Sequence, residues 1–126
     1  MVSFEDMKLE EGSPIYLQII HHLKMGIAAG TVQDGEELPS RRTLSALLGV
    51  NPNTIQKAFR ILEEEGLIVS HVGAKSFVSV TREQVQRLEQ QLPDTHARQF
   101  IKQMQAMGLS CTQVVGLVER LWKEEV

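Results

Sequence analysis

Amide, hydroxyl and basic side chains gather within residues 51–57, the expected first two turns of a helix that Asn51-Pro52 begins. Amide side chains can form two hydrogen bonds with the edge of an adenine, and a threonine can contact a phosphate or a thymine methyl group. We therefore predict that this segment reads base edges in DNA. The candidate residues are Asn51, Asn53, Thr54, Gln56 and Lys57. The alternative is that Asn51 only caps the helix and that its neighbours only solvate the first turn.

Positive charge is concentrated in the same region. The charged residues between positions 38 and 62 are all basic, whereas acidic residues lie on either side, at positions 34–37 and 63–65. The net charge of −3 argues mildly against a nucleic-acid partner for the chain as a whole. A surface that faces phosphates needs only local positive potential, however, so the local excess of basic residues is compatible with DNA binding.

Two adjacent arginines, Arg41 and Arg42, begin the helix that precedes the polar cluster. The fork of an arginine side chain suits the geometry of a phosphate, so we predict that this helix start contacts the DNA backbone. Neighbouring residues on a helix point about 100° apart, so only one of the two arginines is expected to face DNA squarely. Thr43 belongs to the same predicted contact set.

Two short helices are predicted to position these side chains. Ser40 can cap the first helix, and Gly49 ends it. Asn51-Pro52 starts the second helix, and Gly66 closes it. The inward face of the second helix carries Ile55, Ala58, Phe59 and Leu62. Two helices joined by so tight a turn are typical of a helix-turn-helix, in which the second helix enters the major groove.

A further helix precedes this pair. Ser13 can cap it, with Pro14 in the first helical position. Apolar residues then recur four apart from Ile15 to Ile27, which predicts one buried stripe. Residues 1–12 carry four acidic side chains and are expected to form a loosely ordered arm.

After residue 66 the pattern changes to that of β-strands. Residues 67–71 and 76–80 are rich in β-branched side chains, and the turn Val72-Gly73-Ala74-Lys75 lies between them. This pattern predicts a β-hairpin, and a hairpin that directly follows a helix-turn-helix is a wing. We predict that Gly73 and Lys75 approach DNA at the wing tip. The alternative for Lys75 is an exposed turn lysine without a role in binding.

Residues 81–126 are predicted to be entirely helical. The first helix of this segment is expected to break or kink sharply at Pro93, and Ser110 can cap the last helix. The short helices cannot cover their own apolar stripes, so we expect these stripes to be buried against a second copy of the chain. The predicted dimerisation residues are Phe100, Ile101, Met104, Met107, Val115, Val118, Leu121 and Trp122.

Together these elements predict a mainly α fold with a small β-hairpin. A winged helix-turn-helix domain is expected at residues 8–80, followed by an all-helical dimerisation domain at residues 81–126. No apolar run approaches the roughly 18 residues that a membrane span needs. The single cysteine, Cys111, cannot form an internal disulfide, which fits a reducing compartment. We therefore expect a cytoplasmic protein without membrane attachment.

Several motifs within residues 8–80 resemble the N-terminal domain of GntR-family regulators. The most specific are Leu-Pro-Ser-Arg-Arg at positions 38–42 and Leu-Gly-Val-Asn-Pro-Asn-Thr at positions 48–54. The resemblance implies a DNA-binding transcription regulator. It also favours Arg42 as the phosphate contact, because Arg41 stands where such sequences usually carry an acid. The wing arginine that is usual in the family is absent, and Lys75 is the candidate to replace it.

The short helical tail resembles that of YtrA-like members of the family. This resemblance implies a homodimer without a cofactor, and control of a transporter operon. A compact dimer without a partner domain favours repression, in which the protein occupies a palindromic operator on double-stranded DNA and blocks polymerase. The sequence leaves a small-molecule effector open.

Other classes of function have weaker support. His21 and His22 are adjacent on one helix and cannot chelate a metal together, and no glycine-rich phosphate loop is present. An enzyme and a metal site are therefore not expected. A winged-helix module that binds protein instead of DNA is the main alternative, but it would not need the basic, polar helix start. A ligand pocket of about 300 Å³ would require the tails of two subunits.

Overall fold

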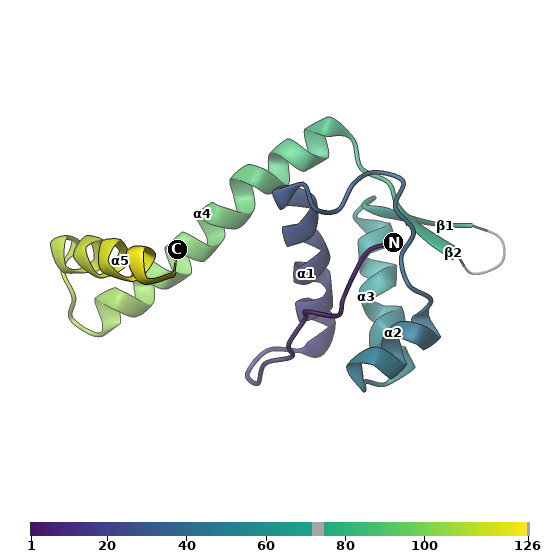
Figure 1. Cartoon of the computed structure of the whole chain (residues 1–126), viewed down its shortest axis with the longest axis horizontal. Helices are drawn as coiled ribbons and strands as arrows, with labels where there is room; N and C mark the ends of the chain where they lie inside the picture. The colour runs from purple at the N-terminus through teal and green to yellow at the C-terminus, as the bar shows by residue number, and fades with distance from the viewer. Residues whose placement is uncertain (72–74, 126) are drawn as a thin grey trace. The chain divides into compact units, whose positions relative to one another are not determined.

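The computed structural model describes residues 1–71 and 75–125, in which five helices and one two-stranded sheet follow one another along the chain (Figure 1). The elements are α1 (Ile15–Ala29), α2 (Arg41–Leu48), α3 (Pro52–Glu64), β1 (Ile68–His71), β2 (Lys75–Val78), α4 (Arg82–Ala106) and α5 (Cys111–Glu125). The predicted mainly α fold with a small hairpin is confirmed. The chain divides into two compact units, residues 1–90 and residues 91–126, and α4 runs through the boundary between them.

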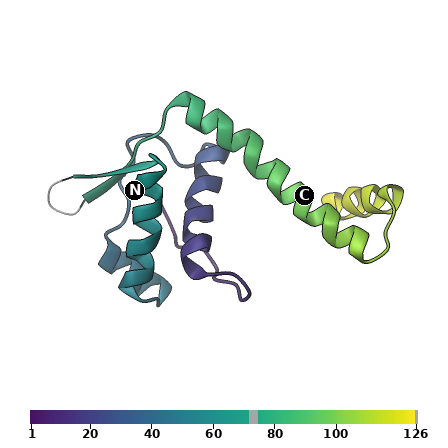
Figure 2. The same ribbon diagram turned by 180° about the vertical axis from the view of Figure 1, so that it is seen from behind.

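The core of the first unit is built from the apolar faces of α1, α2 and α3. Helix α1 lies along α3, and α2 packs against the other side of α3 (Figure 2). The side chains that this packing buries completely include Ile19, Leu23, Ile27, Leu44, Ile55, Phe59 and Leu62. Each such side chain contributes about 1.5–3 kcal/mol by leaving water, so α3 is held rigidly between its two neighbours.

Side-chain caps fix both ends of the turn between α2 and α3. The Ser40 hydroxyl accepts a hydrogen bond of 3.0 Å from the Thr43 N–H, and the Asn51 Oδ1 accepts one of 2.8 Å from the Asn53 N–H. Gly49 has φ of 67°, a left-handed conformation that glycine adopts without steric cost. Both predicted caps and the glycine stop are confirmed.

Replacing Ser40 by Ala is expected to lower the free energy of unfolding by about 1 kcal/mol, because a backbone N–H of α2 loses its acceptor. Ser40→Gly should lower the free energy of unfolding by only about a few tenths of a kcal/mol, because glycine leaves this N–H accessible to water. Urea denaturation of both variants measures the difference. Equal losses in the two variants would contradict a capping role.

Helix α1 begins one residue later than predicted. It starts at Ile15 with Pro14 in the cap position, and no side chain caps it. Instead the Gln18 side chain holds the preceding turn, because its Nε2 donates to the backbone oxygens of Glu10 and Ser13 at 2.8 and 2.9 Å. The predicted Ser13 cap is therefore wrong, and a glutamine in the first turn of the helix takes over this function.

The prediction of a loosely ordered N-terminal arm is also wrong. Val2 and Phe4 are buried, with exposed fractions of 3% and 1%. The Val2 N–H donates to the Glu37 oxygen at 2.9 Å, the His22 Nε2 lies 2.9 Å from the Ser3 oxygen, and the Phe4 and His22 rings lie 4.8 Å apart. Alternate residues of the arm therefore point into the core, while its acidic side chains remain in solvent.

The hairpin after α3 is confirmed, with β2 ending two residues earlier than expected. Strands β1 and β2 are antiparallel, and Ile68 pairs with Val78 at the end nearer α3. The other edge of β2 also has a partner, because the Gly35 N–H donates to the Val78 oxygen and the Val78 N–H donates to the Glu36 oxygen, both at 2.8 Å. Leu38 donates to the Ser76 oxygen at 2.9 Å. Residues 35–38 thus extend the sheet of the wing.

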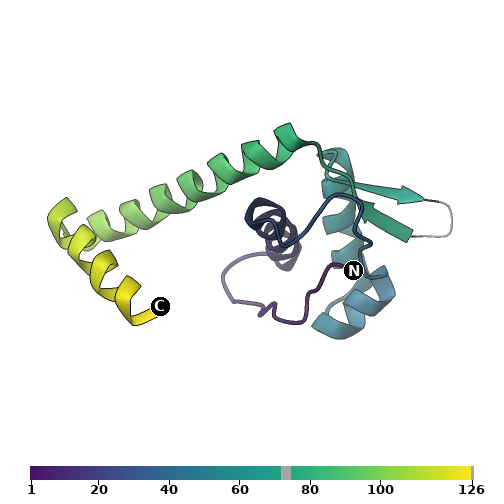
Figure 3. The same ribbon diagram turned by 45° about the horizontal axis from the view of Figure 1, so that its top comes forward.

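The predicted break at Pro93 is wrong, because α4 continues through this residue to Ala106 (Figure 3). An interior proline removes one backbone hydrogen bond. The residues on both sides are mainly strong helix formers (glutamine, glutamate, arginine and leucine), so the helix continues through the proline. Helix α5 begins with the predicted Ser110 cap, and the Gln113 side chain accepts in return from the Ser110 N–H at 2.8 Å. Within the described residues, no helix is long and apolar enough to cross a membrane.

Candidate nucleic-acid interface

The residues predicted to read bases lie on the exposed side of α3. The opposite side of the helix is buried in the core through Ile55 and Phe59. Residues three and four apart share a face of a helix, so the side chains that point away from the core form one polar strip. This strip consists of Asn53, Gln56, Lys57 and Arg60, all exposed.

Two members of the predicted set differ from the rest. Thr54 is half-buried at the edge of the strip, and Asn51 uses its Oδ1 to cap α3. The capping interpretation of Asn51 therefore has direct geometric support, and contact of this residue with a base remains a prediction. Asn53 and Gln56 are the amides best placed to reach a base edge.

Lys57 is held in place by a residue from another helix. Its Nζ lies 4.0 Å from the centre of the Tyr16 ring in the first turn of α1. A lysine ammonium group over an aromatic face is attracted electrostatically by the ring. Tyr16 therefore fixes the position of Lys57 within the polar strip. No local sequence pattern predicts this contact, because the two residues lie in different helices.

The two arginines at the start of α2 point in different directions, as the helical geometry predicts. Arg42 and Thr43 are exposed, and the Thr43 hydroxyl accepts a hydrogen bond of 2.8 Å from Ser40. Arg41 is turned back toward α3, where its Nη2 lies 3.6 Å from the Glu63 Oε1. Arg42 also stands in the first turn of α2, where free backbone N–H groups and the helix dipole favour an anion such as a phosphate.

Replacing Arg42 by Ala should therefore weaken binding to all DNA sequences about equally. The slope of log affinity against log salt should fall by about one unit per subunit, because one phosphate contact is lost. Titration of fluorescent DNA at several salt concentrations measures both quantities. An unchanged slope together with unchanged affinity would show that Arg42 is only a solvated surface residue.

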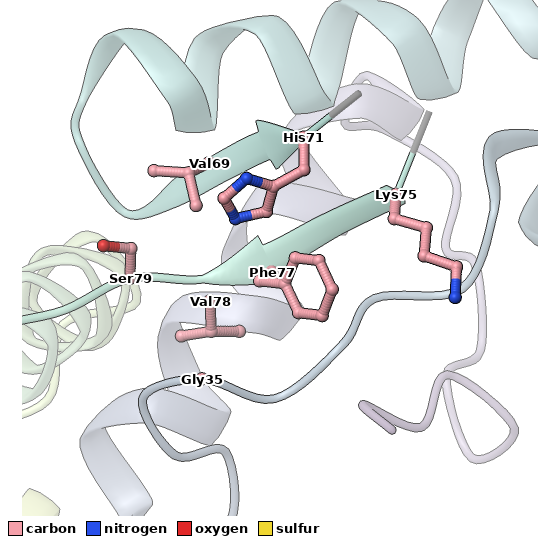
Figure 4. A pocket seen from close by; sticks show the side chains of 7 residues that line it. All are labelled: Gly35, Val69, His71, Lys75, Phe77, Val78 and Ser79. Carbon is pink, nitrogen blue, oxygen red and sulfur yellow. The ribbon is translucent and has the colours of Figure 1, made fainter. Parts of the chain in front are cut away.

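The wing carries one of its two predicted contacts within the described residues. Lys75 is 67% exposed and lies 3.9 Å from the Glu37 Oε1, an ion pair that solvent screens strongly. Gly73 lies outside the described residues. The His71 and Phe77 rings meet edge to face with centres 5.1 Å apart, and both line a pocket of about 530 Å³ together with Lys75 (Figure 4).

No group of three or more histidine, cysteine, aspartate or glutamate side chains in residues 1–71 and 75–125 could hold a metal ion.

The second unit exposes the apolar side chains that were predicted to form a dimer. Trp122 is 70% exposed and Met107 is 64% exposed, while Phe100 and Met104 are half-buried. The other members are exposed by 40–49%: Ile101, Val115, Val118 and Leu121. None of the described residues from 91 to 125 is buried.

Comparison with known proteins agrees with this geometry. Residues 15–78 match the sequence profile described as bacterial regulatory proteins of the gntR family. YhcF, an uncharacterised HTH-type transcriptional regulator of Bacillus subtilis, is 31% identical over 83% of this chain and 87% of its own. The HTH-type transcriptional repressor YtrA of Bacillus subtilis is 40% identical, over 53% of this chain and 52% of its own.

A solved structure extends the similarity beyond the first unit. A GntR family transcriptional regulator from Listeria monocytogenes is 30% identical, with a TM-score of 0.76 over 89% of this chain and 98% of its own. Because the first unit ends at residue 90 of 126, a match over 89% of the chain must extend into the second unit. The chain therefore belongs to the GntR family, whose members are non-enzymatic DNA-binding regulators of transcription.

Proposed function

We propose that this regulator acts as a repressor, and that it binds a palindromic operator as a homodimer joined through its second unit. The observation that carries the proposal is the exposure of apolar side chains on α4 and α5 in a unit whose described residues include none that is buried. A concentration of large exposed apolar side chains in one unit indicates an interaction site. A second copy is the occupant that also explains the DNA-binding unit, because a two-fold axis would present two copies of α3 to two half-sites.

Contacts with DNA are proposed to divide between two kinds of residue. Arg42, Lys57 and Lys75 supply positive charge to the phosphate backbone, which gives affinity for any sequence. Asn53 and Gln56 project from α3 and supply the hydrogen bonds that distinguish one base pair from another. Thr43, Asn51 and Thr54 lie at the edges of this surface and complete the proposed contact set.

Repression is the proposed direction of control. The similarity to YtrA, a named repressor, supports it. A dimer that covers an operator overlapping a promoter excludes polymerase without needing a partner domain. The YtrA-like character of the tail makes a transporter operon the proposed target.

Selection of binding sites from random double-stranded DNA by the full chain tests this proposal. We expect the recovered sequences to contain two inverted half-sites whose centres lie about 34–36 Å, or a multiple of that distance, apart. Sedimentation should show one dimer on each selected site. Recovery of single, non-repeated half-sites bound by a monomer would contradict the homodimer, and recovery of no preferred sequence would contradict operator recognition.

A further inference from the structure

A chain of polar contacts joins four elements of the DNA-binding unit. Glu63, near the end of α3, lies 3.6 Å from the Arg41 Nη2 of α2. The same Glu63 Oε1 accepts a hydrogen bond from the Ser70 hydroxyl of β1. The Ser70 oxygen in turn lies 3.1 Å from that of Ser76 in β2. We call Arg41, Glu63, Ser70 and Ser76 the polar bridge.

The Arg41 side chain is held by contacts within the protein. Its guanidinium carbon lies 5.3 Å from the centre of the Phe59 ring, which is itself buried in the core. The Arg41 side chain is 27% exposed, and its Nε is buried without a hydrogen-bond partner among the described residues. Turning this side chain out to a phosphate would remove both the ring contact and the partner of Glu63.

The two ends of the bridge belong to the two parts of the unit that meet DNA. Arg41 stands beside Arg42 at the start of α2, and Ser70 and Ser76 form a cross-strand pair in the wing. Ser76 is 3% exposed, so this end of the bridge is fixed in the packed interior. Hydrogen bonds to a charged carboxylate are stronger than those between neutral groups, which makes Glu63 the centre of the bridge.

We propose that Arg41 is a positioning residue for DNA binding and does not contact phosphate itself. Through Glu63 and Ser70 it sets the position of the wing relative to the helix-turn-helix, so that Lys75 and α3 reach DNA together. The inference rests on the DNA contacts proposed above, and it assigns to Arg41 a role different from that of its neighbour.

The Glu63→Gln variant distinguishes a positioning role of Arg41 from a phosphate contact, because the two roles predict opposite changes in DNA affinity. If Arg41 positions the wing, Glu63→Gln weakens the bridge, and affinity for a DNA site selected by the wild type falls about two- to fivefold. If Arg41 contacts phosphate, removing its acidic partner frees it and also removes a negative charge, so affinity rises. Glu64→Gln is the matched control, because it removes the same charge from the same helix end and lies outside the bridge. Among the described residues Glu64 pairs only with Arg60 of the polar strip, at 3.9 Å, so the affinity of this control should equal or exceed that of the wild type.

Ser70→Ala tests the bridge without changing any charge. We expect the same few-fold loss of affinity with an unchanged salt slope, because no counterion contact is altered. Ser70→Thr keeps the hydroxyl and should restore the wild-type affinity. Ser79→Ala, just beyond β2 and outside the bridge, should have no effect.

Amide hydrogen exchange of β1 and β2 provides a readout that does not need DNA. Exchange in these strands should be faster in Glu63→Gln and in Ser70→Ala than in Glu64→Gln and in Ser79→Ala. Tighter DNA binding by Glu63→Gln, or strands that exchange as in the wild type in both bridge variants, would overturn the positioning role. A wild-type protein that selects no DNA sequence would overturn operator recognition, while the exchange rates would still decide whether the bridge holds the wing.

Discussion

Replacing Val118 by Asp is expected to convert the protein to a monomer and to weaken operator binding by about 100-fold or more. Val118 is 40% exposed at the centre of the apolar stripe on α5, between Val115 and Trp122. A buried carboxylate at this position would lack a partner in the dimer. Without the dimer, the second DNA-binding unit no longer binds at the high effective concentration that the first one provides.

Sedimentation equilibrium and operator titration of the full chain measure the two consequences. The matched control is Arg120→Asp, which lies on the opposite side of α5 and changes the charge more strongly. This control should remain dimeric and bind the operator with wild-type affinity. A Val118→Asp protein that remains dimeric at micromolar concentration would show that α5 is not the interface, whereas a monomer with intact affinity would show that the dimer is unnecessary.

Replacing Gln56 by Ala is expected to cost about 1–3 kcal/mol of binding free energy at the operator, and much less on unrelated DNA. The Asn53→Ala variant should behave in the same way. Both side chains are exposed on the polar strip of α3, so their loss removes hydrogen bonds to base edges without disturbing the core. The double variant should retain non-specific affinity, because the basic residues that are proposed to contact phosphates are unchanged.

Competition titrations with operator and scrambled DNA measure this difference. Gln86→Ala, an exposed glutamine on α4, is the matched control and should leave both affinities unchanged. Equal losses of affinity for the two DNAs would mean that Gln56 and Asn53 contact the DNA backbone, and that sequence preference arises from other residues.

The helix-turn-helix could be predicted from the sequence because its signals are local. Ser40 and Asn51 cap the helices from adjacent positions, Gly49 adopts a left-handed conformation, and the apolar residues follow the helical period. The resemblance to the GntR family rests on these same short motifs. Each of these signals involves residues only a few positions apart, so both partners of each interaction can be recognised in the sequence.

The features that the sequence did not predict depend on contacts between distant residues. Phe4 packs against His22, Lys57 lies over Tyr16, and Arg41 pairs with Glu63. The acidic composition of residues 1–12 concealed that Val2 and Phe4 alternate with polar residues and enter the core. Pro93 does not end α4, because residues that favour a helix on both sides outweigh the loss of one backbone hydrogen bond.

The pairing of residues 35–38 with β2 has a consequence for the order of events during synthesis. Gly35 and Val78, which join through a 2.8 Å hydrogen bond, lie on either side of α2, α3 and β1 in the chain. The pairing of residues 35–38 with β2 therefore closes a chain loop that contains α2, α3 and β1. Closing this loop costs conformational entropy, and that cost arises once for the three elements together. On the ribosome this closure has to wait until β2 has emerged. We therefore expect that a nascent chain that stops before β2 forms its helices but lacks the strand pairing that fixes their arrangement in the finished protein.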